Sequence, residues 1–276
     1  MIYDVIRWEE KSIVEAARKR GVDLKLFDAR ELILDLDQNY GAQFGNVTLQ
    51  RCVSYYRSIH TTAALEFKGV QVVNDLGTAT TCGNKLLTSL ILVNNKIPTP
   101  HTMLSFNPET SLKALDKLGY PAILKPTVGS WGKLIAILKD RESAESIFED
   151  RESMYPLYQV HYIQEKVERP PRDIRSVVVG DEVIAAIYRN SSAGWRTNTS
   201  RGANTENCPI TNELETLCLK AASAVGKGVF GVDLMETPEG LVVHEVNTTT
   251  EFKNTVPVTG VDIPGAIVEY LLSLAK

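Results

Sequence analysis

The segment DLMETPEGLVVHEVNTTTEFKN, residues 233–254, limits the fold most strongly because it predicts an antiparallel hairpin that carries two acids. Apolar residues flank residues 237–240, and Pro and Gly at the second and fourth positions of this turn are typical of a three-residue hairpin loop. With residues 238–240 as the loop, Asp233 lies opposite Glu245. Opposed side chains in such a pair lie roughly 5 Å apart at Cβ, and like charges there are destabilising. The two carboxylates therefore need a compensating partner.

A divalent cation is one such partner. Glu245 and Asn247 lie two residues apart on a strand and so share one face. Two carboxylates and an amide oxygen suit Mg²⁺, which proteins usually hold through a few carboxylates together with substrate phosphates. Two alternatives stay open: a solvated sheet face, or a one-residue slip that puts Asp233 and Glu245 on opposite faces, as a two-residue loop would. His244 alternates away from Glu245, which predicts a packing role.

The order of elements predicts an α/β and α+β fold. Strands alternate with helices over about the first 75 residues, which favours a parallel sheet, and a helix is expected over 78–95. A smaller α+β unit follows, and then a hairpin over 174–189. We expect three domains, with boundaries 1–78, 79–168 and 169–276. The chain starts abruptly at MIYD, so we expect a short first strand that is either compensated by packing or preceded by residues upstream.

Composition excludes several functional classes. The 276 residues include 30 basic and 34 acidic ones, and a net charge of −4 argues against broad nucleic-acid binding. No apolar run approaches the roughly 18 residues of a membrane helix. The four cysteines form no CxxC pair, so reduced thiols and a cytoplasmic location are expected.

Two lysines and a glycine loop are candidates for binding an anion. Lys85 lies in TCGNKLLTS near the start of a helix, and Lys125 ends the apolar strand in AILKP. In TVGSWGK, Gly129 and Gly132 would let backbone N–H groups approach an anion, and Ser130 adds a hydroxyl donor. The alternatives are surface lysines with apolar stems and a plain hairpin turn.

Several polar residues further along the chain are candidates too. Arg175 and Arg189 lie in apolar strands, where a planar guanidinium suits a phosphate or carboxylate but is also found on sheet edges. Asn198 and Arg201 lie in a long polar loop that the sequence predicts over residues 190–208, of a length that is usually functional or disordered.

One series of residues and motifs resembles the RimK-like branch of the ATP-grasp ligases over essentially the whole chain. In chain order the series is Lys85, LKP with a Gly/Ser loop, QEKV, RDIR, YR, TN…RG and D…E.N. The resemblance implies an ATP-grasp fold, in which an N-terminal parallel α/β domain and two α+β domains enclose the nucleotide. It also implies ATP and two Mg²⁺ ions as cofactors. Within the branch, the chain is most similar to enzymes that join α-aminoadipate to the amino-group carrier protein LysW. The segments that carry this similarity are GSWGK, YIQEKVERPPRDIR, ENCP and EVNTTTEFKN.

The resemblance implies roles for particular residues. The metal ligands would be Asp233, Glu245 and Asn247, and Arg189 and Asn198 would lie where an acyl-phosphate forms. Residues 164–167 are expected to form a strand that faces the adenosine. The residues expected to bind the nucleotide are Lys85, Lys125, Gly129, Ser130, Trp131, Gly132, Gln164, Glu165, Lys166, Val167 and Arg175. The residues expected to bind the amino acid or the carrier are Arg51, Arg57, Arg196, Arg201, Gly202, Asn247, Thr248, Thr249 and Glu251.

The implied reaction starts when a carboxylate of the acidic carrier attacks the γ-phosphoryl group of ATP, and an amine then displaces phosphate. The implied assembly is a homodimer or homotetramer. Two alternatives stay open: an enzyme that attaches glutamate, alone or together with α-aminoadipate, and a non-catalytic nucleotide-binding regulator.

Overall fold

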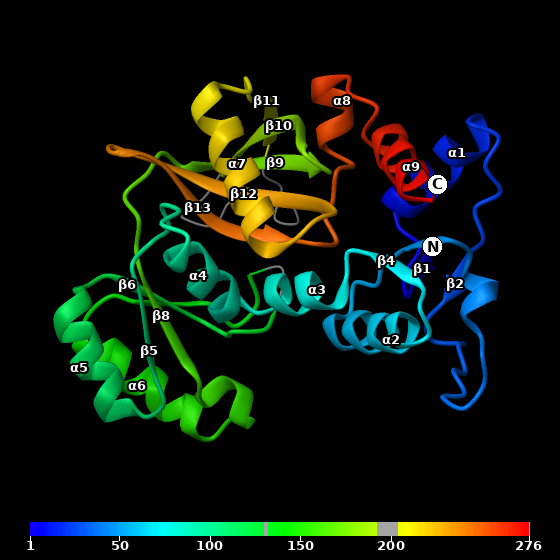
Figure 1. Ribbon diagram of the computed structural model, residues 1–276. Coiled ribbons are helices and arrows are strands. Elements are labelled where there is room, and N and C mark those ends of the chain that lie inside the picture. The colour runs from blue at the N-terminus through cyan, green and yellow to red at the C-terminus, as the bar shows by residue number, and fades with distance from the viewer. Residues whose placement is uncertain (130–131, 192–203, 276) are drawn as a thin grey trace.

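The first part of the chain forms a parallel α/β unit, as the sequence predicts. The computed structural model describes residues 1–129, 132–191 and 204–275. In this unit β1 pairs with β2 and β3 with β4, both in parallel, and a bridge joins Ile2 to Gln50 (Figure 1). Its elements are β1 (Ile2–Tyr3), α1 (Trp8–Lys19), β2 (Phe27–Asp28), β3 (Val47–Leu49), α2 (Tyr55–Phe67) and β4 (Gln71–Val73). The first strand is as short as expected, and Ile2 is fully buried.

The helix predicted over 78–95 is wrong in one respect, because two helices cover this stretch: α3 (Leu76–Gly83) and α4 (Lys85–Asn94). Asn84 is extended, with φ −124° and ψ 112°, and its side chain accepts hydrogen bonds from the N–H groups of the two residues after Lys85. This is the geometry of a helix N-cap. The break therefore makes Lys85 the first residue of a new helix.

The central part is a four-stranded antiparallel sheet in the order β5–β8–β6–β7. Two helices pack on it and bury Leu115 and Phe148 (Figure 1). Its elements are β5 (Thr102–Ser105), α5 (Pro108–Leu118), β6 (Ala122–Lys125), β7 (Ala136–Leu138), α6 (Arg141–Glu152) and β8 (His161–Glu165). These strands and helices form the α+β unit that the sequence predicts after the first part.

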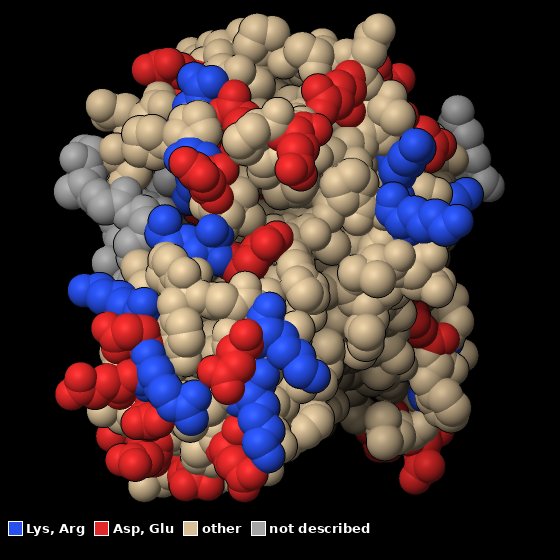
Figure 2. Space-filling view, turned by 90° about the vertical axis from the view of Figure 1, so that its left-hand side faces the viewer, with Lys and Arg blue, Asp and Glu red and all other residues tan. Residues whose placement is uncertain are grey.

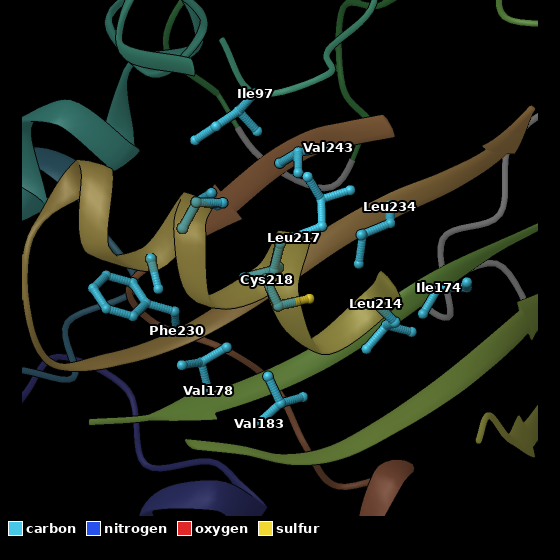
Figure 3. Close-up of a cluster of buried hydrophobic side chains, with 14 of the residues drawn as sticks. Ile97, Ile174, Val178, Val183, Leu214, Leu217, Cys218, Phe230, Leu234 and Val243 are labelled. Atoms are coloured by element: carbon cyan, nitrogen blue, oxygen red, sulfur yellow. The ribbon is translucent and has the colours of Figure 1, made fainter. Parts of the chain in front are cut away.

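The last part is a five-stranded antiparallel sheet in the order β11–β10–β9–β12–β13. Helix α7 packs across it, and Leu217 and Cys218 of the helix meet Phe230 and Leu234 of β12 (Figure 3). Its elements are β9 (Arg172–Val179), β10 (Glu182–Asn190), β11 (Asn204–Asn207), α7 (Asn212–Val225), β12 (Val229–Thr237) and β13 (Gly240–Asn247). Strand β11 lies in the stretch that the sequence predicts as a polar loop.

Apolar contacts join the parts at two places among the described residues. Helices α3 and α4 contribute Cys82 and Leu92 to the core under the five-stranded sheet. After α8 (Thr255–Thr259), helix α9 (Ile263–Leu274) returns to α1, where Ile267 packs near Ile13 in a shared core (Figure 1). The C-terminal helix therefore holds the first unit against the last.

The surface and the helices agree with the composition. Lys and Arg side chains are interspersed with Asp and Glu on the face seen in Figure 2, where no extended basic area appears. Ion pairs such as Arg141 with Asp116 and Lys113 with Glu109 contribute to this mixture. In the described part of the chain, no helix has the length and apolar character needed to span a bilayer.

Candidate functional site

The β12–β13 hairpin brings the two acids together, although the predicted loop is wrong. Thr237 pairs with Gly240, so the loop contains two residues instead of three. That change alone would place Asp233 and Glu245 on opposite faces. A β-bulge between Asp233 and the next residue shifts the register back by one, and Asp233 lies opposite Glu245 as predicted.

The bulge also overturns the prediction for His244. This residue is the extra one in the bulge, so the alternation of faces is broken between it and Glu245. Both residues line the same cleft, and the Nε2 atom of His244 lies 2.6 Å from the Nζ atom of Lys125 on β6. His244 is thus part of the site, and strict alternation along the strand could not reveal it.

Lys125 is a buried cation whose hydrogen-bond partners are neutral. Its ammonium group donates to Gln164 Oε1 at 2.5 Å, and its side chain is almost inaccessible to solvent. Burial lowers its pKa to about 7; the charge of Glu245 opposes that effect, while Lys85 and Arg169 add to it. Burial, with Lys125 nearby, also holds the pKa of His244 well below its usual range, so the imidazole accepts the hydrogen bond.

Lys85 links the glycine segment to the hairpin. Its Nζ atom donates to the carbonyl of Gly129 at 2.7 Å and lies 3.3 Å from Glu245 Oε1. Its own N–H donates to the Thr127 carbonyl at 2.8 Å. Gly129 and Gly132 have φ values of 153° and 65°, in the region that favours glycine. Of the predicted loop, Ser130 and Trp131 lie outside the described residues.

Asp233 is held by two arginines. Arg175 forms a two-pronged ion pair with it, in which Nη2 donates to Oδ2 at 2.8 Å, and Arg189 Nη2 lies 3.2 Å from Oδ1. Arg189 also donates to Asp173 at 2.6 Å. Burial alone would raise the pKa of Asp233, but the two guanidinium groups outweigh it and hold this pKa far below its usual range.

The acid cluster suits a hard cation. Asp233, Glu245 and Asn247 all line the cleft. The amide nitrogen of Asn247 is buried and has no hydrogen-bond partner among the described residues, so this side chain has a polar group that no described residue uses. Among the described residues, no three His, Cys, Asp or Glu side chains lie close enough together to hold a metal ion. A magnesium ion here would need these two carboxylates and the amide together with oxygens from outside the chain.

The end of β8 forms another wall of the cleft. Gln164 is buried, and Glu165 accepts a hydrogen bond from the backbone N–H of His101 at 2.7 Å. The strand ends at Glu165, so Lys166 and Val167 lie in the following connection and not in the predicted strand. All four residues line the cleft.

The predicted substrate residues divide into three groups. Thr248, Thr249 and Glu251 line the cleft together with Arg57, which pairs with Asp4 at 3.2 Å. The prediction for Arg51 is wrong, because this side chain is buried against Glu10 and the Thr250 carbonyl, and so it is not open to a carboxylate in the cleft. The predicted residues Arg196, Asn198, Arg201 and Gly202 lie outside the described residues.

These residues meet in one cleft of about 1330 Å³, lined by all three parts of the chain. Its walls bring buried cations close to paired carboxylates, an arrangement able to hold a polyphosphate and a metal ion. The described residues that were predicted for the nucleotide and the metal all line this cleft. They come from five separate segments, so only the folded chain brings them together.

Comparisons with known proteins point to one family. Residues 82–271 match the RimK-like ATP-grasp domain, and residues 1–81 match the LysX preATP-grasp domain. The chain is 37% identical to the alpha-aminoadipate–LysW ligase LysX of Sulfurisphaera tokodaii, over 99% of this chain and 95% of that protein. It is 32% identical to the glutamate–LysW ligase ArgX of the same organism, over 98% and 96% of the two chains.

A solved structure agrees on the fold. A RimK domain ATP-grasp protein from Sphaerobacter thermophilus superimposes with a TM-score of 0.78 and 24% identity, over 98% of this chain and 99% of that chain. The predicted fold class and family are therefore confirmed. The chain belongs to the RimK-like ATP-grasp family.

Proposed function

We propose that this protein is an ATP- and Mg²⁺-dependent ligase. It joins the amino group of α-aminoadipate to the side-chain carboxylate of the C-terminal glutamate of the carrier protein LysW. The observation that carries the proposal is the single cleft in which Lys85, Lys125, Asp233 and Glu245 meet. The LysX relatives, at 35–37% identity, support the choice of substrate, since the ArgX relatives are at 32%.

In the proposed nucleotide site, Lys85 and Lys125 bind the phosphates, and the loop over residues 129–132, with Ser130 and Trp131, covers them. Backbone and side-chain groups of residues 164–167 hold the adenosine. The Lys125 ammonium, whose hydrogen-bond partners among the described residues are neutral, gains an anionic partner when a phosphate arrives. This gain supports the assignment of Lys125 to phosphate binding.

In the proposed metal site, Asp233, Glu245 and Asn247 hold two Mg²⁺ ions together with phosphate oxygens. Bound magnesium neutralises charge on the γ-phosphoryl group. Arg175 then keeps Asp233 oriented through their ion pair. The presence of two carboxylates and both lysines in one cleft argues against a regulator that binds nucleotide without turnover.

The proposed chemistry has two steps. A carboxylate oxygen of the carrier attacks the γ-phosphorus, the bond to the β-phosphate oxygen breaks, and ADP leaves. The amine then attacks the acyl carbon, inorganic phosphate leaves, and the amine loses a proton. Arg189 and Asn198 stabilise the acyl-phosphate, and the residues that bind the amino acid and the carrier are Arg196, Arg201, Gly202, Thr248, Thr249 and Glu251.

The wider assignments are proposals as well. We propose three domains at residues 1–78, 79–168 and 169–276, a cytoplasmic location and a homodimer or homotetramer. The acidic carrier and a small amino acid are the proposed partners, with no role for nucleic acid or membrane.

The test is ADP release in the presence of MgATP. We expect release that depends on both LysW and α-aminoadipate, and its loss in Glu245→Ala. Release that required glutamate in place of α-aminoadipate would favour the alternative ligase. No release under any combination would contradict the proposal and favour a nucleotide-binding regulator.

A further inference from the structure

A group of buried charges lies between α1 and the segment that follows β13. Glu9, Glu10 and Arg51 are 4%, 1% and 1% exposed. None of them has a part in the proposed chemistry. Burying a charge is costly unless it is paired and hydrogen-bonded, so the partners of these residues indicate what the group holds in place.

Glu9 holds the backbone of the segment at two points. Its Oε1 atom accepts hydrogen bonds from the N–H groups of Phe252 at 3.1 Å and Lys253 at 3.0 Å. The Phe252 side chain is fully buried and meets the Trp8 ring edge to face, with 6.0 Å between the ring centroids. The start of α1 therefore fixes both the backbone and an apolar anchor of this segment.

Arg51 holds the segment at Thr250, two residues before Phe252. Its Nε atom donates to Glu10 Oε1 at 2.9 Å, and its Nη2 atom donates to the Thr250 carbonyl at 3.1 Å. The hydroxyl of Thr249 donates to the carbonyl of Cys52, the residue after Arg51, at 3.3 Å. Residues 249–253 are thus attached to the first unit through both main-chain and side-chain groups.

The attached segment is also a wall of the cleft. Thr248, Thr249 and Glu251 line it. The hydroxyl of Thr250 lies 3.5 Å from Nη1 of Arg175, which forms the ion pair with Asp233. A continuous set of contacts therefore runs from α1 through residues 250–253 to the acid cluster.

We propose that Glu9 and Arg51 are positioning residues that set the shape of the amino-acid subsite through the backbone of residues 250–253. The first domain thereby takes part in choosing the amino acid through the backbone that it holds in place. This inference rests on the proposed ligase function. A displacement of about 1 Å in a positioning element can cost up to about a hundredfold in rate, so loss of these bonds has a measurable effect.

The test uses Glu9→Gln and Arg51→Lys, each of which keeps a side chain of similar size but weakens the charged hydrogen bonds. Glu15→Gln and Arg18→Lys are the controls, because these residues lie on α1, pair with each other at 2.9 Å and have exposed side chains. We expect KM for α-aminoadipate to rise about tenfold in the test variants while KM for MgATP stays within about twofold. The preference for α-aminoadipate over glutamate falls as well.

A second readout follows the backbone directly. Amide hydrogen exchange at Phe252 and Lys253 accelerates in Glu9→Gln, with unchanged exchange in Glu15→Gln. If both KM values rise equally, or if exchange and selectivity match those of the controls, the inference is wrong. If Glu9→Gln does not fold, Arg51→Lys decides the matter by the same readouts. A wild-type protein that forms no amide product contradicts the proposed function instead, and the exchange data then still report whether Glu9 holds the segment.

Discussion

Lys125 and Arg189 are both buried cations in the wall of one cleft, yet their surroundings are opposite. Arg189 lies between two carboxylates, with Asp173 at 2.6 Å and Asp233 at 3.2 Å. Lys125 has Gln164 and His244 as its hydrogen-bond partners, and both are neutral. Burial alone lowers the pKa of both groups; the two carboxylates reverse this effect and raise the pKa of Arg189, whereas the pKa of Lys125 falls to about 7.

The difference separates a cation whose charge is matched by carboxylates of the protein from one whose hydrogen-bond partners are neutral. A buried charge that is matched inside the protein stabilises the protein's own arrangement, and removing it leaves its partners unpaired. A buried charge without an acidic hydrogen-bond partner gains most from an anion that arrives from outside. Arg189 therefore stabilises the fold in addition to its proposed role at the acyl-phosphate, whereas Lys125 serves the binding of phosphate.

The largest expected effect is on stability. Arg189→Met leaves Asp173 and Asp233 buried with less compensation, so the free energy of unfolding falls by about 3–5 kcal/mol. Urea denaturation measures it. Arg141→Met is the control, because its ion pairs are exposed and we expect a change below about 1 kcal/mol. Equal effects of the two substitutions would remove the distinction drawn for Arg189.

For Lys125→Met we expect a loss of activity without a loss of stability. We expect kcat/KM for MgATP to fall by about 10²–10³, since a charged group aimed at the phosphates is lost. The free energy of unfolding at pH 6 does not fall, because methionine fills a similar volume and removes a buried charge. Steady-state kinetics and urea denaturation measure the two quantities. A variant that is strongly destabilised but kinetically normal would show that Lys125 has a structural role.

The pH dependence gives a smaller effect. Phosphate favours the protonated ammonium, and the pKa of Lys125 without ligand is about 7. KM for MgATP should therefore be flat below pH 7 and rise above it, by at most about tenfold per pH unit. Initial rates from pH 6 to 9 measure this dependence. Lys125→Arg should abolish the rise, since a guanidinium stays protonated throughout. An identical rise in this variant would assign the titration to another group.

The smallest expected effect concerns His244. His244→Leu leaves Lys125 with Gln164 as its remaining partner and removes one net hydrogen bond, worth about 1 kcal/mol. KM for MgATP should change by about fivefold, as measured by initial rates. The control is His60→Leu, an exposed position on α2 where the ring bonds to the carbonyl of Tyr56. The same change in both variants would contradict a local role for His244.

The sequence predicts the local elements well, because periodicity and capping residues are local signals. It pairs Asp233 with Glu245 correctly but for an incomplete reason, since a shorter loop and a bulge cancel each other. The residue in the bulge bonds to Lys125, which is 119 positions away. The sequence of the hairpin alone therefore could not predict that contact.

The other differences also depend on distant contacts. The sequence makes Arg51 a candidate for binding a substrate carboxylate, and only its packing against Glu10 and Thr250 shows that it is buried. The break between α3 and α4 is easier to explain, because Asn84 is a common N-cap residue in front of a helix. Asn was therefore a local signal that could have predicted the break.

The most direct test of the central claim is the intact mass of LysW after incubation with this protein, MgATP and equal amounts of α-aminoadipate and glutamate. The account predicts that the carrier gains the mass of α-aminoadipate less one water. A gain of glutamate would keep the chemistry and contradict the assigned amino acid, and no gain with either amino acid would contradict the proposed ligase.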